Sequence, residues 1–400
     1  MDPGAADRSN DRTAPGQNSS RFIALDGLRG VAAVMVVVYH FLLATKLSDE
    51  YLRVLSGETS SSPVVGLIAN TPLRYLVMGP EAVIVFFVLS GFVLVLPMLR
   101  GRGLDLWNYF PRRLLRLWLP SAAAVVLAII VIVATRQDPA QVASSWSQAF
   151  SFPTLTAGDV VDSFFLITGS PKLNNPLWTL RWELLFSLLL PIAVLLVRGV
   201  KRRQWLWILV CGAASGIGAV VGVQALAYGP VFLAGGLLAS TVVARDGDAS
   251  RRTSWAWFVG GILLIAVPDI VRLALPGDVQ GFLRPFSQGF VVTGAVLLVY
   301  ALIGDSGLSR FFSLGVFRFL GRISFSLYLI HVPLLLGAIH LVPAHPMRAM
   351  VVALPVIFVV AWVFTRVVEE PSAAFARRVG ERASLSARRL AMPEPSRRVG

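Results

Sequence analysis

The chain has 400 residues, of which 56% are hydrophobic and only 14% are charged, and its formal net charge is +14. Its mean hydropathy is +0.71. No water-soluble fold can bury that much apolar sequence, so the composition indicates an integral membrane protein. The single cysteine, Cys211, excludes an intramolecular disulfide, and no His or Cys cluster has metal-binding spacing. Arginine in loops on one side of a bilayer explains the positive charge better than a nucleic-acid partner does.

Apolar runs near the ~20 residues needed to cross a bilayer recur along the chain. They predict an all-α, polytopic membrane protein with about ten transmembrane helices, over residues 28–45, 79–99, 117–135, 177–197, 204–223, 228–244, 255–273, 285–303, 323–342 and 349–367. Residues 1–20 are polar, and we expect a disordered cytoplasmic tail there. The transmembrane domain is expected over 21–371. Residues 372–400 are expected to form a basic cytoplasmic tail, either solvated near anionic lipid or docked on a cytoplasmic partner.

Basic residues concentrate in every second connection between these runs. They include Arg100, Arg102, Arg112, Arg113, Arg116, Arg198, Lys201, Arg202, Arg203, Arg245, Arg251, Arg252, Arg310, Arg318 and Arg322. Cytoplasmic connections of membrane proteins carry such an excess of Lys and Arg. The pattern therefore predicts a multi-pass protein of the cell's inner (plasma) membrane with both termini in the cytoplasm.

The first apolar run carries a histidine, His40, eleven residues after Arg29. Eleven residues are close to three helical turns, so the two side chains share a helix face and lie roughly 16 Å apart along the axis. Asp26, fourteen residues before His40, lies on the same face. A histidine at that depth either forms a structural hydrogen bond with a neighbouring helix or serves a function, and its cost in a membrane favours function.

Two further stretches place charge at or inside the apolar runs. Arg113 and Arg116 are three residues apart, so a helix presents them together, and arginine forks suit phosphate oxygens. The alternative for this pair is an ordinary positive-inside anchor. Glu183 lies within an apolar run, where a carboxylate needs a partner.

The ninth run contains His331, nine residues beyond Arg322 and therefore near mid-depth, in a structural or a functional role. His340 and His345 fall at or beyond the end of this run, and we expect both at the surface. Ser90 and Gly91 favour a close helix-packing contact over a nucleophile, and no G-x-S-x-G elbow supports a serine hydrolase.

Six sequence blocks follow one another along the chain. The first is R-F-I-A-L-D-G-L-R-G followed by V-V-V-Y-H-F, and the others are G-P-E-A-V-I-V-F-F-V-L-S-G-F, R-R-L-L-R-L-W-L-P, L-W-T-L-R-W-E, G-R-I-S-F-S-L-Y-L-I-H and V-E-E-P. Together these blocks resemble the membrane-bound acyltransferase 3 family, in which they occur in the same order. Each block alone is a modest signal, but their common order over residues 21–371 is specific.

The resemblance implies an integral-membrane O-acyltransferase that moves acetyl or another short acyl group from acyl-CoA to a hydroxyl. The implied acceptors are sugars of envelope polysaccharides or glycolipids, or glycosylated natural products. Arg29 and His40 match the family's arginine-then-histidine motif. Arg113 and Arg116 match its paired arginines, and Glu183 matches its carboxylate.

We therefore expect acyl-CoA, acetyl-CoA in particular, as a co-substrate, with no tightly bound cofactor and no metal. The expected partners are membrane lipids, acyl-CoA and a carbohydrate-bearing acceptor. The three arginines would bind the CoA phosphates, and His40 would act as general base or carry the acyl group. Glu183 would orient an imidazole or the acceptor. For Asp26, His331 and Trp178 we expect acceptor-binding or structural roles.

Two other classes of function fit parts of the sequence. In a proton-coupled transporter or flippase, His40, Glu183 and His331 would form a path through the membrane. No inverted repeat or pair of broken helices in the sequence favours this class. A non-catalytic scaffold would gain nothing from polar groups placed inside its apolar helices.

Overall fold

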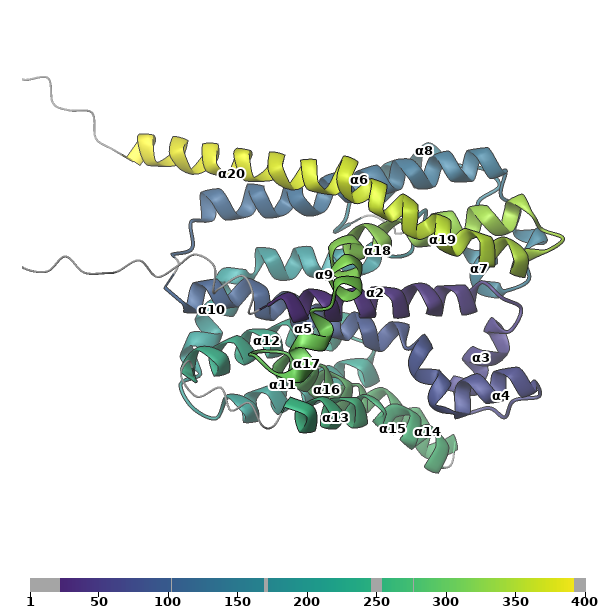
Figure 1. The fold of residues 1–400 in the computed structure, drawn as a ribbon, viewed down its shortest axis with the longest axis horizontal. Helices are drawn as coiled ribbons and strands as arrows, with labels where there is room; N and C mark the ends of the chain where they lie inside the picture. The colour runs from purple at the N-terminus through teal and green to yellow at the C-terminus, as the bar shows by residue number, and fades with distance from the viewer. Residues whose placement is uncertain (1–21, 102, 169–171, 246–253, 276, 392–400) are drawn as a thin grey trace, which may run out of the picture.

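The computed structural model describes residues 22–101, 103–168, 172–245, 254–275 and 277–391. Residues 1–20, for which the sequence predicts a disordered tail, lie outside these ranges. Within the described ranges the chain forms helices and no strand, which confirms the all-α prediction. The helices form one bundle (Figure 1).

The helices differ in length from single turns to long rods. In chain order they are α2 (Ile23–Leu43), α3 (Ser48–Leu55), α4 (Pro63–Asn70), η1 (Pro72–Val77), α5 (Gly79–Leu99), α6 (Leu106–Thr135), η2 (Pro139–Gln141), α7 (Ser145–Ala149), α8 (Ala157–Phe164), α9 (Leu177–Leu188), α10 (Leu190–Gly199), α11 (Gln204–Val221), α12 (Gln224–Ala244), α13 (Ser254–Ile265), α14 (Val267–Ala274), α15 (Gly277–Phe286), α16 (Gln288–Ala301), α17 (Gly307–Phe312), α18 (Gly315–Leu341), α19 (Pro346–Phe364), η3 (Thr365–Glu369) and α20 (Glu370–Ala391).

Eight helical stretches of the described chain are long and apolar enough to cross a membrane, and two of these run through α15 and α16 and through α19 and α20. Up to ten crossings result if each of two bent pairs is one span. The pairs are α9 with α10, bent by 63°, and α13 with α14, bent by 43°. Pro191 and Pro268 lie in the first turns of α10 and α14. A proline removes a backbone hydrogen bond and clashes with the preceding turn, which explains both bends. The predicted runs 177–197 and 255–273 are therefore bent pairs rather than straight helices.

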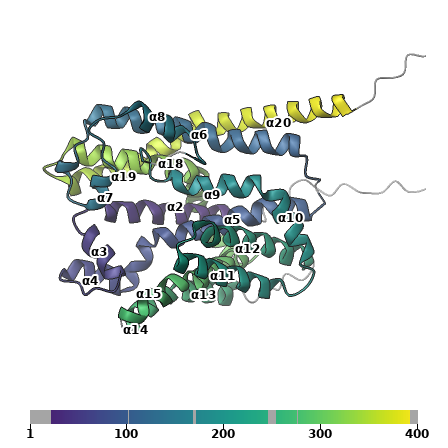
Figure 2. The ribbon, with the colours of Figure 1, turned by 180° about the vertical axis from the view of Figure 1, so that it is seen from behind.

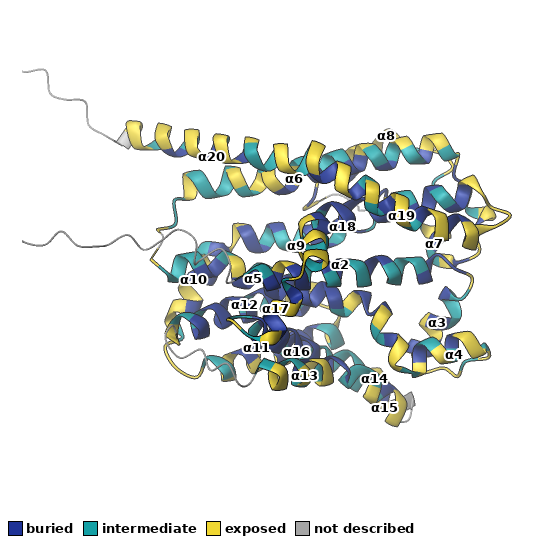
Figure 3. Ribbon diagram, in the orientation of Figure 1, coloured by how far each residue is buried: buried dark blue, intermediate teal, exposed yellow. Residues whose placement is uncertain are grey.

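The outside of the bundle is apolar, as expected for a surface in contact with lipid. Leu195 of α10 and Val351 of α19 are 68% and 69% exposed. By contrast, α18 is the most buried of the candidate spans, with 83% of the residues in its most apolar stretch buried inside the molecule. Figure 3 shows the buried residues gathered along α18, α2 and α5. These observations support a multi-pass membrane protein built around α18.

The two ends of the bundle differ. The short helices α3, α4, α7, α14 and α15 gather at one end, which we call the α4 end (Figure 1). Figure 2 shows α10 and α20 at the opposite end, which we call the α20 end. Helix α2 begins on the side of the α20 end and runs towards the α4 end, so Arg29 lies nearer the α20 end and His40 nearer the α4 end.

Two glycines allow α2 and α18 to pack at backbone distance. A Cβ atom on Gly321 would collide with the carbonyl oxygen of Asp26, and one on Gly30 would collide with the backbone of Gly321. Small residues at helix crossings permit this close approach in membrane proteins. The crossing fixes the register of α2 against α18, and with it the relative positions of the histidines further along both helices.

Much of the segment for which the sequence predicts a basic tail forms helix α20 (Glu370–Ala391). Helix α20 continues α19 through the π-helical turn η3 and lies along the first part of α6 (Figure 1). Ser384 and Arg388 of α20 both reach Asp105, the N-cap residue of α6. The hydrogen bond from Ser384 is the main reason why the pKa of Asp105 lies below its ordinary value. The small residues Ala376 and Ser384 are buried in this contact, a signal hidden by the polar composition of the segment.

We predict that Gly321→Ala destabilises the protein by about 1–3 kcal/mol, because the added methyl group overpacks the α2–α18 crossing. The measurement is the thermal unfolding midpoint of the detergent-solubilised protein. Gly229→Ala, at a helical glycine with no atom within 4 Å of an added Cβ, is the matched control. Equal midpoints for the two variants would contradict the crossing as a close-packed contact.

Candidate functional site

The described part of the bundle has a cavity towards each end. The first, of about 770 Å³, is bounded by α2, α5, α6, α9, α18 and η3. We call it the basic cavity, because its lining includes Arg29, Arg100, Arg113 and Arg116. Three carboxylates, those of Asp26, Glu183 and Glu369, also line it, so the arginines exceed the acids.

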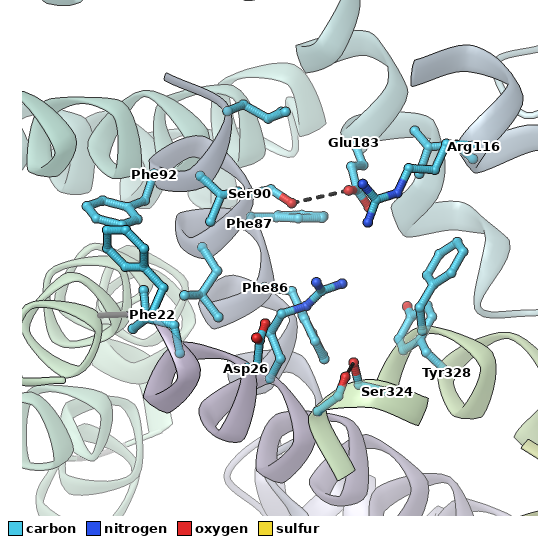
Figure 4. Close-up of a pocket in the computed structure, with 18 of the residues that line it drawn as sticks. Phe22, Asp26, Phe86, Phe87, Ser90, Phe92, Arg116, Glu183, Ser324 and Tyr328 are labelled. Atoms are coloured by element: carbon cyan, nitrogen blue, oxygen red, sulfur yellow. Dashed lines mark hydrogen bonds between the residues drawn. The ribbon is translucent and has the colours of Figure 1, made fainter. Parts of the chain in front are cut away.

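Arg113 and Glu183 form an ion pair in the wall of the basic cavity. Arg113 Nη2 lies 2.5 Å from Glu183 Oε1, and Arg113 Nε donates to Ser187 Oγ at 3.0 Å. Ser90 Oγ donates to the same Glu183 oxygen at 3.2 Å, as the dashed line in Figure 4 shows. The paired side chains are only 15% and 20% exposed, so each charge depends on the other for its stability. The buried carboxylate thus has the partner that the sequence analysis required.

The same contacts refine the interpretation of Ser90 and Gly91. Gly91 does make the predicted packing contact, because an added Cβ would collide with the carbonyl oxygen of Phe232. Ser90 instead faces the basic cavity and binds Glu183 (Figure 4). Its role in the structure is therefore polar rather than one of packing.

Arg29 and Arg116 differ from Arg113, because neither makes a hydrogen bond or an ion pair with any described residue. Both line the basic cavity, and Arg116 is exposed to it. Their electrostatic neighbours are Asp26 and Glu369, which lie beyond ion-pair distance. Figure 4 shows Arg116 and Asp26 reaching into the cavity from opposite sides. The guanidinium groups of Arg29 and Arg116 are therefore available to bind an anion such as a phosphate.

Glu369 is a cavity residue that the sequence analysis did not single out. Its Oε2 accepts a hydrogen bond from Ser326 Oγ at 2.6 Å, and Ser326 Oγ in turn accepts one from Thr365 at 2.8 Å. Glu369 ends the π-helical turn η3, and such turns in α-helices are frequent at functional sites. A signal was present in the V-E-E-P block, which places a carboxylate directly after the last apolar run.

The second cavity, of about 790 Å³, lies towards the α4 end. We call it the histidine cavity, because His40 lines it together with large aromatic residues that include Trp146, Trp178 and Tyr228. The centre of the Trp146 ring lies 5.3 Å from that of His40. An apolar, aromatic pocket with few polar groups is the usual form of a site for a small organic ligand.

His40 and His331 are joined by a hydrogen bond between their rings. His40 Nδ1 lies 2.8 Å from the Val36 carbonyl oxygen, and His331 Nδ1 lies 2.8 Å from that of Tyr328. A carbonyl oxygen only accepts, so both Nδ1 atoms carry the proton. His331 Nε2 therefore has a lone pair, and it lies 3.2 Å from His40 Nδ1. His40 Nε2 is left without a hydrogen-bond partner in the described part of the chain, as a free base beside the cavity.

The basic and histidine cavities are separated by a thin wall. Val83 and Tyr328 line both cavities and therefore form this wall. The Tyr328 hydroxyl lies 2.8 Å from Thr179 Oγ1, a contact that holds the phenol ring in place. The structure thus brings Arg29 and His40 to two cavities that share one wall, and not to a single open channel.

The remaining predicted residues fall on either side of this wall. Trp178 lines the histidine cavity, with its ring centre 5.5 Å from that of Tyr228. Glu183 lines the basic cavity and pairs with Arg113, and no hydrogen bond or ion pair joins it to either histidine ring. An orienting role for Glu183 on an imidazole therefore has no direct contact to support it.

The prediction that His340 is a surface residue is wrong. The residue is only 5% exposed, and its ring nitrogens lie 2.8 Å from the Leu336 carbonyl oxygen and 3.3 Å from that of Asp138. The loop that follows α6 covers this end of α18, and no local pattern reveals such a contact. His345 is exposed, as predicted.

The fold and the two cavities define a multi-pass membrane protein with a cavity towards each end of its bundle. The chain belongs to the acyltransferase 3 family, whose sequence profile, described as an acyltransferase domain, matches residues 22–366. It is also similar to the acyltransferase clz18 of Cochliobolus lunatus, with 25% identity over 391 residues, covering 77% of this chain and 81% of that protein. No solved structure is detectably similar. The family resemblance noted in the sequence is confirmed, and the chain is a membrane acyltransferase.

We predict that Arg113→Leu lowers the free energy of unfolding by about 1–3 kcal/mol, because Glu183 is left in the cavity wall without its cation. The double variant Arg113→Leu/Glu183→Leu should recover most of this loss. Thermal unfolding in detergent, compared across the two single variants and the double variant, measures the coupling. Additive losses would show that the pair contributes nothing as a pair.

Proposed function

We propose that the chain is an O-acyltransferase that takes an acyl group, acetyl in the first instance, from acyl-CoA in the basic cavity. The acceptor is a hydroxyl of a sugar or glycosylated molecule in the histidine cavity. The observation that carries this proposal is His40. Its Nδ1–H is held by a carbonyl and by His331, while its Nε2 is free beside a cavity that shares a wall with the basic cavity.

The arginines without an ion-pair partner indicate where acyl-CoA binds. CoA carries several phosphate groups, and Arg29 and Arg116 line the basic cavity and form no ion pair with any carboxylate in the described part of the chain. Arg113 contributes less to phosphate binding than the sequence suggests, because Glu183 already compensates its charge. Arginine-rich connections favour the α20 end as the cytoplasmic end of a protein in the plasma membrane, where acyl-CoA is available.

The acyl transfer needs a base beside the hydroxyl group that receives the acyl group. As the hydroxyl oxygen forms a bond to the acyl carbon, the C–S bond of the thioester breaks and the hydroxyl proton passes to His40 Nε2. His331 Nε2 then faces the Nδ1–H of an imidazolium and stabilises its charge. The CoA thiolate takes up a proton from solvent on the side of the basic cavity and leaves as the thiol, and His40 Nε2 returns to its free form by releasing the hydroxyl proton to solvent on its own side. An acyl group carried briefly on His40 Nε2 uses the same atom, so both routes depend on it.

The wall between the cavities defines the point of transfer. The acyl group must pass Tyr328 and Val83 to reach His40, and the pantetheine arm is the flexible part of the donor that can extend to this wall. The aromatic rings of the histidine cavity offer flat apolar surfaces that suit the faces of a sugar ring.

We predict that His40→Ala lowers acyl transfer by at least about 100-fold, the scale of a lost general base. The measurement is acyl-CoA-dependent labelling of acceptor by purified protein in detergent, where no compartments exist between which a transporter could work. The exposed His345→Ala is the matched control and should keep full activity. Wild-type labelling by His40→Ala would overturn the assignment.

We predict that Arg116→Ala raises the KM for acetyl-CoA by about 10- to 100-fold, because a charge-assisted contact to phosphate is lost. The KM for acetyl-pantetheine, which lacks the phosphates, should not change. Steady-state kinetics with both donors test this. Arg112→Ala is the control, since Arg112 lies on the same helix and outside the cavity lining. An equal rise with both donors would mean that Arg116 does not bind phosphate.

A further inference from the structure

A cluster of charged side chains lies in the wall of the histidine cavity opposite the bundle core. Three arginines and two carboxylates lie together where η1, the start of α5, α14 and α15 meet. They are Arg74, Glu81, Asp269, Arg272 and Arg284. This cluster is separate from the basic cavity, and the reaction described above does not use it.

Two of the arginines account for both carboxylates. Arg74 Nη2 lies 2.7 Å from Glu81 Oε1, and Arg74 Nε lies 3.5 Å from Asp269 Oδ1. Arg272 Nε lies 3.7 Å from the same Asp269 oxygen. Arg272 also donates to Asn70 and to the Ala69 carbonyl, at 2.9 Å and 2.6 Å. The Arg74 and Arg272 side chains are only 6% and 4% exposed, so these ion pairs are internal to the wall.

The third arginine, Arg284, has no ion-pair partner among the described residues. Its guanidinium makes no hydrogen bond or ion pair with any described residue, although Asp269 and Glu81 are among its electrostatic neighbours. Arg284 is half-buried and lines the histidine cavity, as does Glu81. The wall therefore presents a net positive charge, and one arginine without a counterion, to the cavity that holds His40.

An uncompensated guanidinium in an aromatic pocket favours an anionic ligand, because desolvation strengthens the attraction and arginine forks match carboxylate and phosphate oxygens. Resting on the proposed function, we infer that the acceptor is anionic. It carries a carboxylate or a phosphate that Arg284 binds while its hydroxyl lies at His40 Nε2. A sugar acid and a sugar phosphate both present this chemistry.

The test starts from the products in cells. A strain lacking this chain is complemented with wild type or His40→Ala, and mass spectrometry of envelope glycans, glycolipids and secreted glycosides identifies the acylated species that require His40. These species should carry a carboxylate or phosphate on the acylated sugar or its neighbour. Neutral species would overturn the inference while leaving the acyltransferase intact. If no species depends on His40, the proposed function fails, and this inference fails with it.

The role of Arg284 is then measured with the acceptor isolated from the strain that lacks this chain. Arg284→Gln should raise the KM for this acceptor at least about tenfold and change kcat less than about threefold, since a charge-assisted contact is lost and the chemistry is not. Arg284→Lys keeps the charge and should retain most of the affinity. Arg348→Gln, at an exposed arginine towards the same end, is the matched control. An unchanged KM for Arg284→Gln in folded protein would overturn the inference.

Chemical removal of the anionic group distinguishes its two sources. Carboxyl reduction of the acceptor removes a carboxylate, and phosphatase treatment removes a phosphate monoester. The treatment that raises the KM for wild type should have no effect on Arg284→Gln, because that variant no longer senses the charge. Loss of affinity of equal size in both proteins would contradict a contact between Arg284 and the anion.

Discussion

The contact between the backbones of α2 and α18 is the constraint on which the site depends. Gly30 and Gly321 allow the two helices to touch, and further along the same helices this register places the His40 and His331 rings 3.2 Å apart at Nδ1 and Nε2. Carbonyl oxygens of the helices themselves fix the tautomers of both rings. The reactive nitrogen of His40 is therefore set by helix packing and not by a mobile loop.

Charge compensation sorts the polar residues into structural and functional groups. Arg113 with Glu183, and Arg74 with Glu81, are ion pairs of the protein interior, and each satisfies charges that would otherwise be costly to bury. Arg29, Arg116 and Arg284 have no such partner in the described chain and face the cavities instead. In a membrane protein, an arginine that faces a cavity and lacks a carboxylate is the residue most suited to bind an anionic ligand.

Much of the fold could be predicted from the sequence, because apolar runs and helical periodicity are local properties. They predicted the helices, and they placed Arg29 and His40 on one of them. The wall at Tyr328, the role of Glu369 and the burial of His340 could not be predicted, since each depends on side chains brought together from distant helices. The same holds for Arg284, because its lack of an ion pair depends on the ion pairs that Arg74 and Arg272 form with Glu81 and Asp269.

The wall formed by Val83 and Tyr328 has an electrical consequence. In the proposed orientation, the thiolate is protonated on one side of this wall and the hydroxyl loses its proton on the other. Unless a proton crosses with the acyl group, each turnover displaces one elementary charge against the membrane voltage, at about 2.3 kcal/mol per 100 mV. The wall would thereby make the rate of acylation depend on the membrane voltage.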